Sequence, residues 1–214
     1  MAIEFKKTSL SGKTPTIWRG ECKILPGGFK PKNTIPTGTV LKRALPLFID
    51  FANMEAAVIK VAKVLTGGTT TKVRVAKGHL FAVSDVIMKV GKDDASPSIS
   101  SIDTSNADYD VLNLSAGISG ITADDVIIEA SPYVAAVEAT ETAEATEAVP
   151  AAPLYVPNAV VGADKEFNGK GLPTIDAAYE AVVLYPSVDY PILESWLIGG
   201  ICLKNNPTIK FIQQ

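Results

Sequence analysis

The chain has 214 residues, of which 47% are hydrophobic, 20% charged and 7% aromatic, so it is long enough for one or two domains with a buried core. The net charge of −3 is close to neutral, and the two cysteines, Cys22 and Cys202, are too few for a disulfide framework. We therefore expect reduced thiols in a protein made in a cytoplasm, without a secretory signal or a membrane-spanning segment.

The charge is unevenly distributed along the chain. Residues 1–43 carry nine Lys or Arg and two Glu, whereas residues 93–147 carry twelve Asp or Glu and no Lys or Arg. Such a dipolar chain is suited to head-to-tail contact with copies of itself or to contact with an acidic surface. Chance segregation of solvated charges is the alternative.

Residues 1–32 are predicted to form an extended basic N-terminal arm. Gly12-Lys13-Thr14 matches the end of a phosphate-binding loop, but Lys7 stands where that pattern needs glycine, and Pro15 interrupts the helix that should follow. Aromatic rings beside cations are typical of binding hot spots, and prolines reduce the entropy lost on docking. The candidate partner-binding residues are Trp18, Arg19, Lys13, Lys23, Phe29 and Lys30.

Two other interpretations of this segment stay open. Trp18 could cap the protein's own core instead of contacting a partner. A basic segment can also bind nucleic acid, but few aromatic residues interleave with the charges and no binding motif is present, so no nucleic-acid partner is expected.

Residues 33–92 contain short β-prone runs separated by turn residues. The runs are "GTVLKRA", "LPLFIDF", "EAAVIKVAKVL", "TTTKVRVAKG" and "HLFAVSDVIMKVG", with Pro36, Pro46 and Gly67-Gly68 among the breaks. Close spacing of this kind predicts an antiparallel meander that forms a small barrel or sandwich. A second group of strands is expected at 98–102, 109–115 and 125–130.

Composition changes abruptly after residue 131. Residues 134–152 are nearly all Ala, Glu, Thr and Val, which argues against a stable helix, so 131–153 is predicted to be a mobile acidic insertion exposed to solvent. Beyond it, "LYVPNAVV", "YEAVVLYP" and "TIKFIQQ" predict strands, and "YPILESWLIGGI" predicts a short C-terminal helix. The fold class is therefore mainly β with minor α+β character, in one β-rich domain over 33–214.

The sequence offers no catalytic constellation. His79 is the single histidine and has no cysteine or elbow serine near it, and a histidine of this kind is usually structural. The aspartates of "DTSNADYD" at 103–110 lack the glycine and the closing glutamate of a calcium loop. We therefore expect a protein that is not an enzyme and that uses no metal and no cofactor.

The stretch "IPTGTVLKRALPLFIDFANMEAAVIKVAKVLTGGTTTKVRVAKGHLFAVSDVIMKVG", with the later "SGITADDVIIEA", resembles head fibre or head decoration proteins, the auxiliary capsid proteins of tailed bacteriophages. Phages and prophages of gut Bacteroidales carry such proteins. The likeness covers about residues 30–130, and "ESWLIGGICLKNNPTIKFIQQ" also resembles the close of these proteins. These are turn-and-strand patterns and not catalytic signatures.

The resemblance implies a non-enzymatic virion protein that is made in the bacterial host cytoplasm and binds the outside of the capsid. Its partners would be the major capsid protein and further copies of itself, with a trimer as one candidate state. Residues 1–32 would then anchor the chain to the capsid or to a neighbouring subunit. The alternative is a module on the virion that binds a carbohydrate or another host-surface glycan, which predicts several aromatic residues gathered on one patch.

Overall fold

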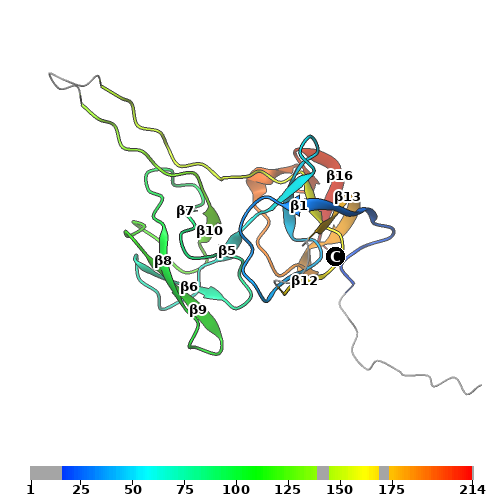
Figure 1. The fold of residues 1–214 in the computed structure, drawn as a ribbon, viewed down its shortest axis with the longest axis horizontal. Helices are drawn as coiled ribbons and strands as arrows, with labels where there is room; N and C mark the ends of the chain where they lie inside the picture. The colour runs from blue at the N-terminus through cyan, green and yellow to red at the C-terminus, as the bar shows by residue number, and fades with distance from the viewer. Residues whose placement is uncertain (1–15, 139–144, 169–173, 214) are drawn as a thin grey trace, which may run out of the picture.

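A computed structural model describes residues 16–138, 145–168 and 174–213. Strands make up 44% of it and helices 3%, which confirms the mainly β fold class predicted from the sequence. The strands form two lobes, the barrel lobe (residues 16–59, 153–168 and 174–213) and the second lobe (residues 60–130) (Figure 1). A long hairpin, formed by residues 131–138 and 145–152, leaves the body where the chain passes from the second lobe to the barrel lobe and is called the hairpin arm.

Five strands close into a ring in the barrel lobe. Their order is β1–β4–β3–β11–β13, and β13 pairs back onto β1. Neighbours are antiparallel except β1 and β4, which run parallel. Fully buried alanines on several of these strands keep the ring narrow. The bounds are β1 Lys23–Pro31, β3 Pro46–Asp50, β4 Glu55–Val58, β11 Ala159–Val161 and β13 Ile175–Leu184.

The long strand β13 also carries a sheet extension. Its second half pairs in parallel with β16 (Asn206–Ile212), which places the last strand inside the sheet as the sequence indicated. The hairpin of β14 (Leu197–Ile198) and β15 (Cys202–Leu203) continues the sheet beyond β16. A separate ribbon joins β2 (Thr39–Leu41) to β12 (Lys165–Phe167). The sequence did not single out β12, β14 or β15.

The predicted C-terminal helix is not a helix in the structure. "YPILESWLIGGI" contains one 3-10 turn, η2 (Glu194–Trp196), followed directly by β14, and a further 3-10 turn, η1 (Tyr185–Ser187), precedes it. Leu193, Trp196 and Leu197 have helical spacing. The two glycines after Ile198 instead form a tight turn, and the strand pairing on either side of that turn outweighs the helix propensity of a short segment.

The second lobe consists of two small antiparallel sheets packed over their own core. One sheet has the order β5–β10–β7 and the other β6–β9–β8. In β9 the burial alternates along "YDVLNL", so one face covers the core and the other faces solvent. The bounds are β5 Val61–Lys63, β6 Lys72–Ala76, β7 Ile87–Lys89, β8 Ile99–Asp103, β9 Tyr109–Leu114 and β10 Val126–Glu129.

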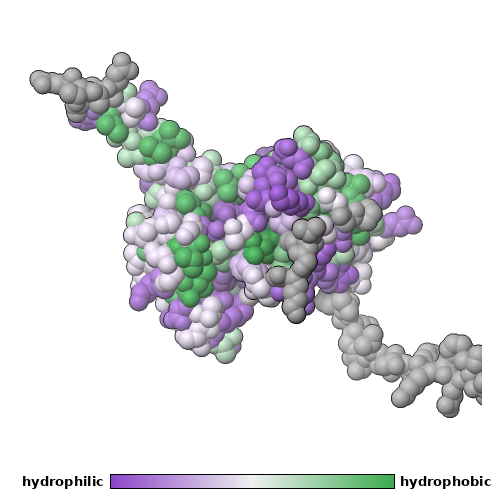
Figure 2. All heavy atoms as spheres, in the orientation of Figure 1, coloured by the Kyte–Doolittle hydropathy of each residue, from purple (hydrophilic) through white to green (hydrophobic). Residues whose placement is uncertain are grey.

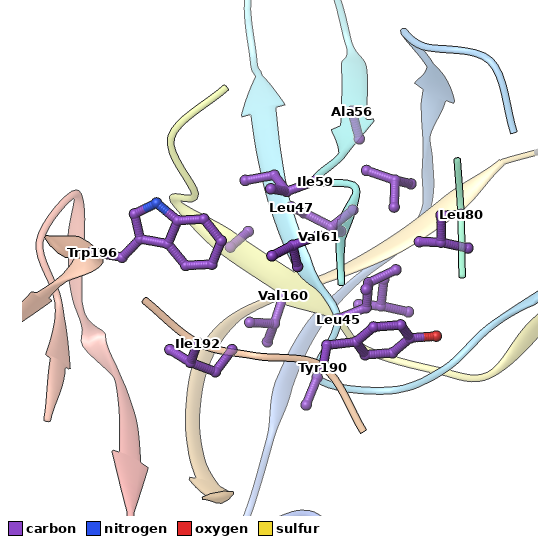
Figure 3. Close-up of a cluster of buried hydrophobic side chains, with 14 of the residues drawn as sticks. Leu45, Leu47, Ala56, Ile59, Val61, Leu80, Val160, Tyr190, Ile192 and Trp196 are labelled. Atoms are coloured by element: carbon purple, nitrogen blue, oxygen red, sulfur yellow. The ribbon is translucent and has the colours of Figure 1, made fainter. Parts of the chain in front are cut away.

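The two lobes pack directly on each other. Val61, Leu80 and Ile128 belong to the second lobe by sequence but lie in the hydrophobic cluster of the barrel lobe. Figure 3 shows Leu80 on one side of this cluster and Trp196, from the C-terminal extension, on the other. A separate cluster that includes Val75, Phe81 and Leu112 fills the second lobe.

The predicted N-terminal arm lies partly inside the barrel. Residues 1–15 are outside the described residues. Trp18 forms a bridge with Val183 of β13, and Lys23–Pro31 is the strand β1 of the ring. The described part of 1–32 is therefore a wall of the barrel and not a segment separate from the body.

The predicted acidic insertion is an antiparallel hairpin over the residues that are described. Bridges join Ala130 to Pro153, Val134 to Val149 and Val137 to Thr146, so the two strands keep one register along the arm. The tip, 139–144, lies outside the described residues. Within the described part of the chain, no helix has the length and the apolar character needed to cross a membrane.

Candidate functional site

Two of the six predicted contact residues serve the protein's own fold. Phe29 is 2% exposed and meets Phe51 edge to face, with 5.8 Å between the ring centroids. Trp18 is half-buried and packs against the barrel core. Phe29 therefore cannot be a surface contact, and the core-capping interpretation of Trp18 describes its place in the structure. Lys13 lies outside the described residues.

The other three predicted residues are exposed, Lys23 and Lys30 on β1 and Arg19 in the segment that precedes it. Lys23 pairs with Glu180 at 2.7 Å, and Lys30 lies 3.9 Å from Glu55. Arg19 is exposed, and its backbone N–H donates to the carbonyl of Val182. The structure thus places these cations on the surface of the barrel, but it does not gather them around a hollow with Trp18 and Phe29.

His79 is held in a structural role by hydrogen bonds at both ring nitrogens. The N–H of Phe81 donates to Nδ1 at 3.2 Å, so the proton of the neutral ring lies on Nε2, which faces Asp110 Oδ2 at 3.3 Å. Asp110 also pairs with Lys77 at 2.5 Å. Burial lowers the pKa of His79, and the charge of Asp110 opposes that shift. A general base needs a free nitrogen, and neither nitrogen is free here.

A buried charge network links the two lobes. Lys60, 1% exposed, pairs with Asp85 at 2.7 Å and with Glu129 at 3.2 Å. Asn33 of the barrel lobe donates to Glu129 at 3.2 Å and to the carbonyl of Val58 at 2.8 Å. Burial raises the pKa of Glu129, and Lys60 counteracts this. These groups satisfy one another, which identifies a structural junction.

The described residues contain no group of three or more His, Cys, Asp or Glu side chains arranged to hold a metal ion. Two surface features stand out instead, the hairpin arm and a groove between the lobes.

The hairpin arm exposes apolar side chains that nothing in the described chain covers. Every residue of 132–138 and 145–150 is exposed. Val134, Val137 and Val149 have 51%, 52% and 55% of their surface in solvent. Val134 and Val149 face each other across the two strands, while Glu138 and Glu147 add negative charge. Figure 2 shows the resulting mixture of hydrophobic and hydrophilic residues along the arm.

The interlobe groove consists of two adjoining hollows of about 280 Å³ and 520 Å³. Both are lined by Lys63, Asp189, Tyr190 and Pro191, so they form one continuous depression between the lobes. Val61, Ala62 and Leu65 line the smaller hollow, and Lys42, Lys77 and His79 also border it. Burial raises the pKa of Tyr190 to about 12, so its phenol stays neutral.

The sequence interpretation placed 131–153 in solvent but missed the strand pairing of the arm, and it missed the groove. The arm carries a usable signal, because Val and Thr in "VAAVEATETAEATEAV" favour strands, although the alanines and glutamates point the other way. The groove has no signal in the sequence, since its walls come from segments more than 100 residues apart.

Comparison of the chain with models of known families, with curated proteins and with solved structures gave no match.

Proposed function

We propose that the chain is a non-enzymatic structural protein of a tailed-phage virion, which binds the outer surface of the capsid as a decoration or head fibre subunit. The hairpin arm is the observation that carries the proposal. The resemblance of residues 30–130 to such proteins supports it, as does a histidine whose two nitrogens are both occupied by structural hydrogen bonds.

An isolated hairpin has little stability of its own. A two-stranded ribbon is marginally stable in water unless it packs on another surface. The arm has solvent on both faces and still shows three valines, so its stable surroundings are expected to include a neighbouring molecule. A regular lattice supplies such neighbours and multiplies weak contacts, so each subunit needs modest affinity.

The fold also limits which part of residues 1–32 can serve as the proposed anchor. Lys23–Pro31 is a strand of the barrel, so removal of residues 1–32 would unfold the protein and would not test attachment. Residues 1–15 include Lys6, Lys7 and Lys13 and can be removed without cutting a described strand. The proposed anchor is therefore this shorter basic segment.

The test uses virions of the phage whose genome encodes the chain, prepared with and without its gene. Electron cryo-microscopy should show the protein on the outer face of the shell, and purified chain should rebind to particles that lack it. Deletion of 1–15 should abolish rebinding while circular dichroism and the unfolding midpoint stay unchanged.

Virions without the polypeptide on their surface would overturn the proposal. A glycan array in which the isolated protein binds a defined sugar, together with failure to rebind shells, would favour the host-surface alternative. Among the described residues, the exposed aromatics Phe51, Tyr133 and Tyr179 come from three separate segments of the chain, whereas this alternative predicts several aromatic residues gathered together.

A further inference from the structure

We infer that the hairpin arm of one copy binds in the interlobe groove of a second copy, so that the chain assembles head to tail with itself. The inference deepens the proposed function and rests on its assembly role for the arm. It is based on the complementarity of two surfaces. The arm exposes valines and glutamates, and the groove is apolar and bordered by lysines.

The apolar parts of the two surfaces are complementary. Val134, Val137 and Val149 are each about half exposed on the arm, and removing this apolar surface from water favours association. The groove presents Leu65 and Pro191, which are both partly exposed, along the hollow between the lobes.

The charged parts are complementary as well. Glu138 and Glu147 lie beside the valines of the arm, and the described residues of the arm include no Lys or Arg. Lys42 and Lys63 border the groove with side chains that are 53% and 57% exposed. Their partners within the chain, Asp189 and Asp124, are exposed too. Exposed ion pairs contribute little, so these lysines can exchange partners at low cost.

The contact must form between copies and not within one chain. Figure 1 shows the arm extending away from both lobes, with its strands held in register up to Val137 and Thr146. The arm and the groove are different surfaces of the molecule. A contact between different surfaces is heterologous, and it closes into a ring or continues along a shell according to the rotation between subunits.

The test is charge reversal, with self-association of the full chain measured by sedimentation velocity at low salt. Glu138→Lys/Glu147→Lys on the arm, or Lys42→Glu/Lys63→Glu on the groove, should each weaken association by about tenfold or more, because two attractive pairs become repulsive. Combining the four substitutions should restore association. Lys72→Glu/Lys204→Glu is the matched control, since it changes the same charge at exposed sites away from the groove.

Several outcomes would overturn the inference. Wild-type chain that stays monomeric at about 100 μM, an arm reversal without a matching effect of the groove reversal, or a combined variant without rescue each contradicts it. Val137→Ser/Val149→Ser, which changes exposed positions only, gives a second variant that should also weaken association.

Failure of this inference is distinguishable from failure of the proposed function. Monomeric chain that still rebinds shells would remove the arm-in-groove contact and leave the virion role intact. Chain that self-associates through the arm and the groove but is absent from virions would remove the virion role and leave the arm-in-groove contact intact.

Discussion

His79 shows at the scale of one residue how burial determines chemistry. Its ring is enclosed next to Asp110, with Lys77 and Asp85 as the other charged groups that act on it. Burial lowers its pKa below the ordinary value of 6.5, so the unfolded chain takes up a proton at a higher pH than the folded chain does. The stability that His79 contributes is complete above pH 6.5 and is lost as the pH falls from there through the folded-state pKa.

The lowered pKa of His79 predicts how the stability of His79→Asn, which cannot titrate, compares with that of the wild type as the pH changes. The free energy of unfolding of both proteins is measured in urea from about pH 7.5 to about pH 5.5. The advantage of wild type over the variant should shrink as the pH falls. Glu129, whose pKa is shifted in the opposite direction by burial, contributes equally to both proteins. A difference that stays constant across this range would contradict the assignment.

At the scale of the element, the C-terminal hairpin depends on a pair of glycines. Gly199 and Gly200 have φ angles of 59° and 70°, and Ile201 N–H donates to the carbonyl of Ile198 at 3.2 Å to close the turn. Positive φ at both central residues matches the right-handed twist of the flanking strands. The turn therefore orients β14 and β15, whose tip exposes Ile198 and Ile201.

Gly199→Ala should destabilise the protein by about 1 kcal/mol, because an L-residue in the left-handed region is strained. A Cβ at this position meets no atom within 4 Å, so steric overlap adds nothing. Gly199→Asn is the control at the same site, since asparagine adopts this conformation readily. Urea unfolding should therefore place Asn between Ala and the wild type. Equal losses for Ala and Asn would show that something other than φ is responsible.

The hairpin arm receives little stabilisation from the rest of the described chain. Its strands are paired with each other, but 132–138 and 145–150 are exposed throughout. Its composition explains both facts, because valine and threonine favour strand pairing while glutamate and alanine provide no core-facing stripe. This combination suits an element that becomes buried on assembly.

At the scale of the whole molecule, the two lobes are joined through Lys60. Its ammonium group lies between Asp85 and Glu129, and Glu129 also accepts a hydrogen bond from Asn33 of the barrel lobe. The backbone carbonyl of Lys60 accepts from Glu129 N–H at 3.0 Å. The junction therefore couples folding of the second lobe to that of the barrel.

Lys60→Met should lower the free energy of unfolding by about 3–5 kcal/mol, because it leaves two buried carboxyl groups without their cation. Lys72→Met, at an exposed position, is the matched control and should change stability by about 0.5 kcal/mol or less. Urea unfolding followed by circular dichroism measures both. If Lys60→Met were as stable as the control, burial of Asp85 and Glu129 would not depend on the charge of Lys60.

The sequence by itself determined the β class and most strand positions, because these depend on local pattern. Alternation in "KVRVA" and "YDVLNL" marks β6 and β9, and Gly67-Gly68 marks the turn before β6. The absence of a helix at 190–201 could not be foreseen, because spacing alone does not distinguish a helix from a strand that is paired elsewhere.

Only the tertiary structure decided which apolar residues are core and which are available to a partner. Phe29 and Trp18 have the composition of a binding hot spot, but a hot spot and a core require the same large apolar side chains. The pairing of β1 with β4 and β13 buries Phe29, and a bridge to Val183 holds Trp18 against the core, so both positions depend on residues far away in the chain. The groove was decided in the same way, because its walls come from segments far apart in the chain, whereas the arm pairs residues of one contiguous segment.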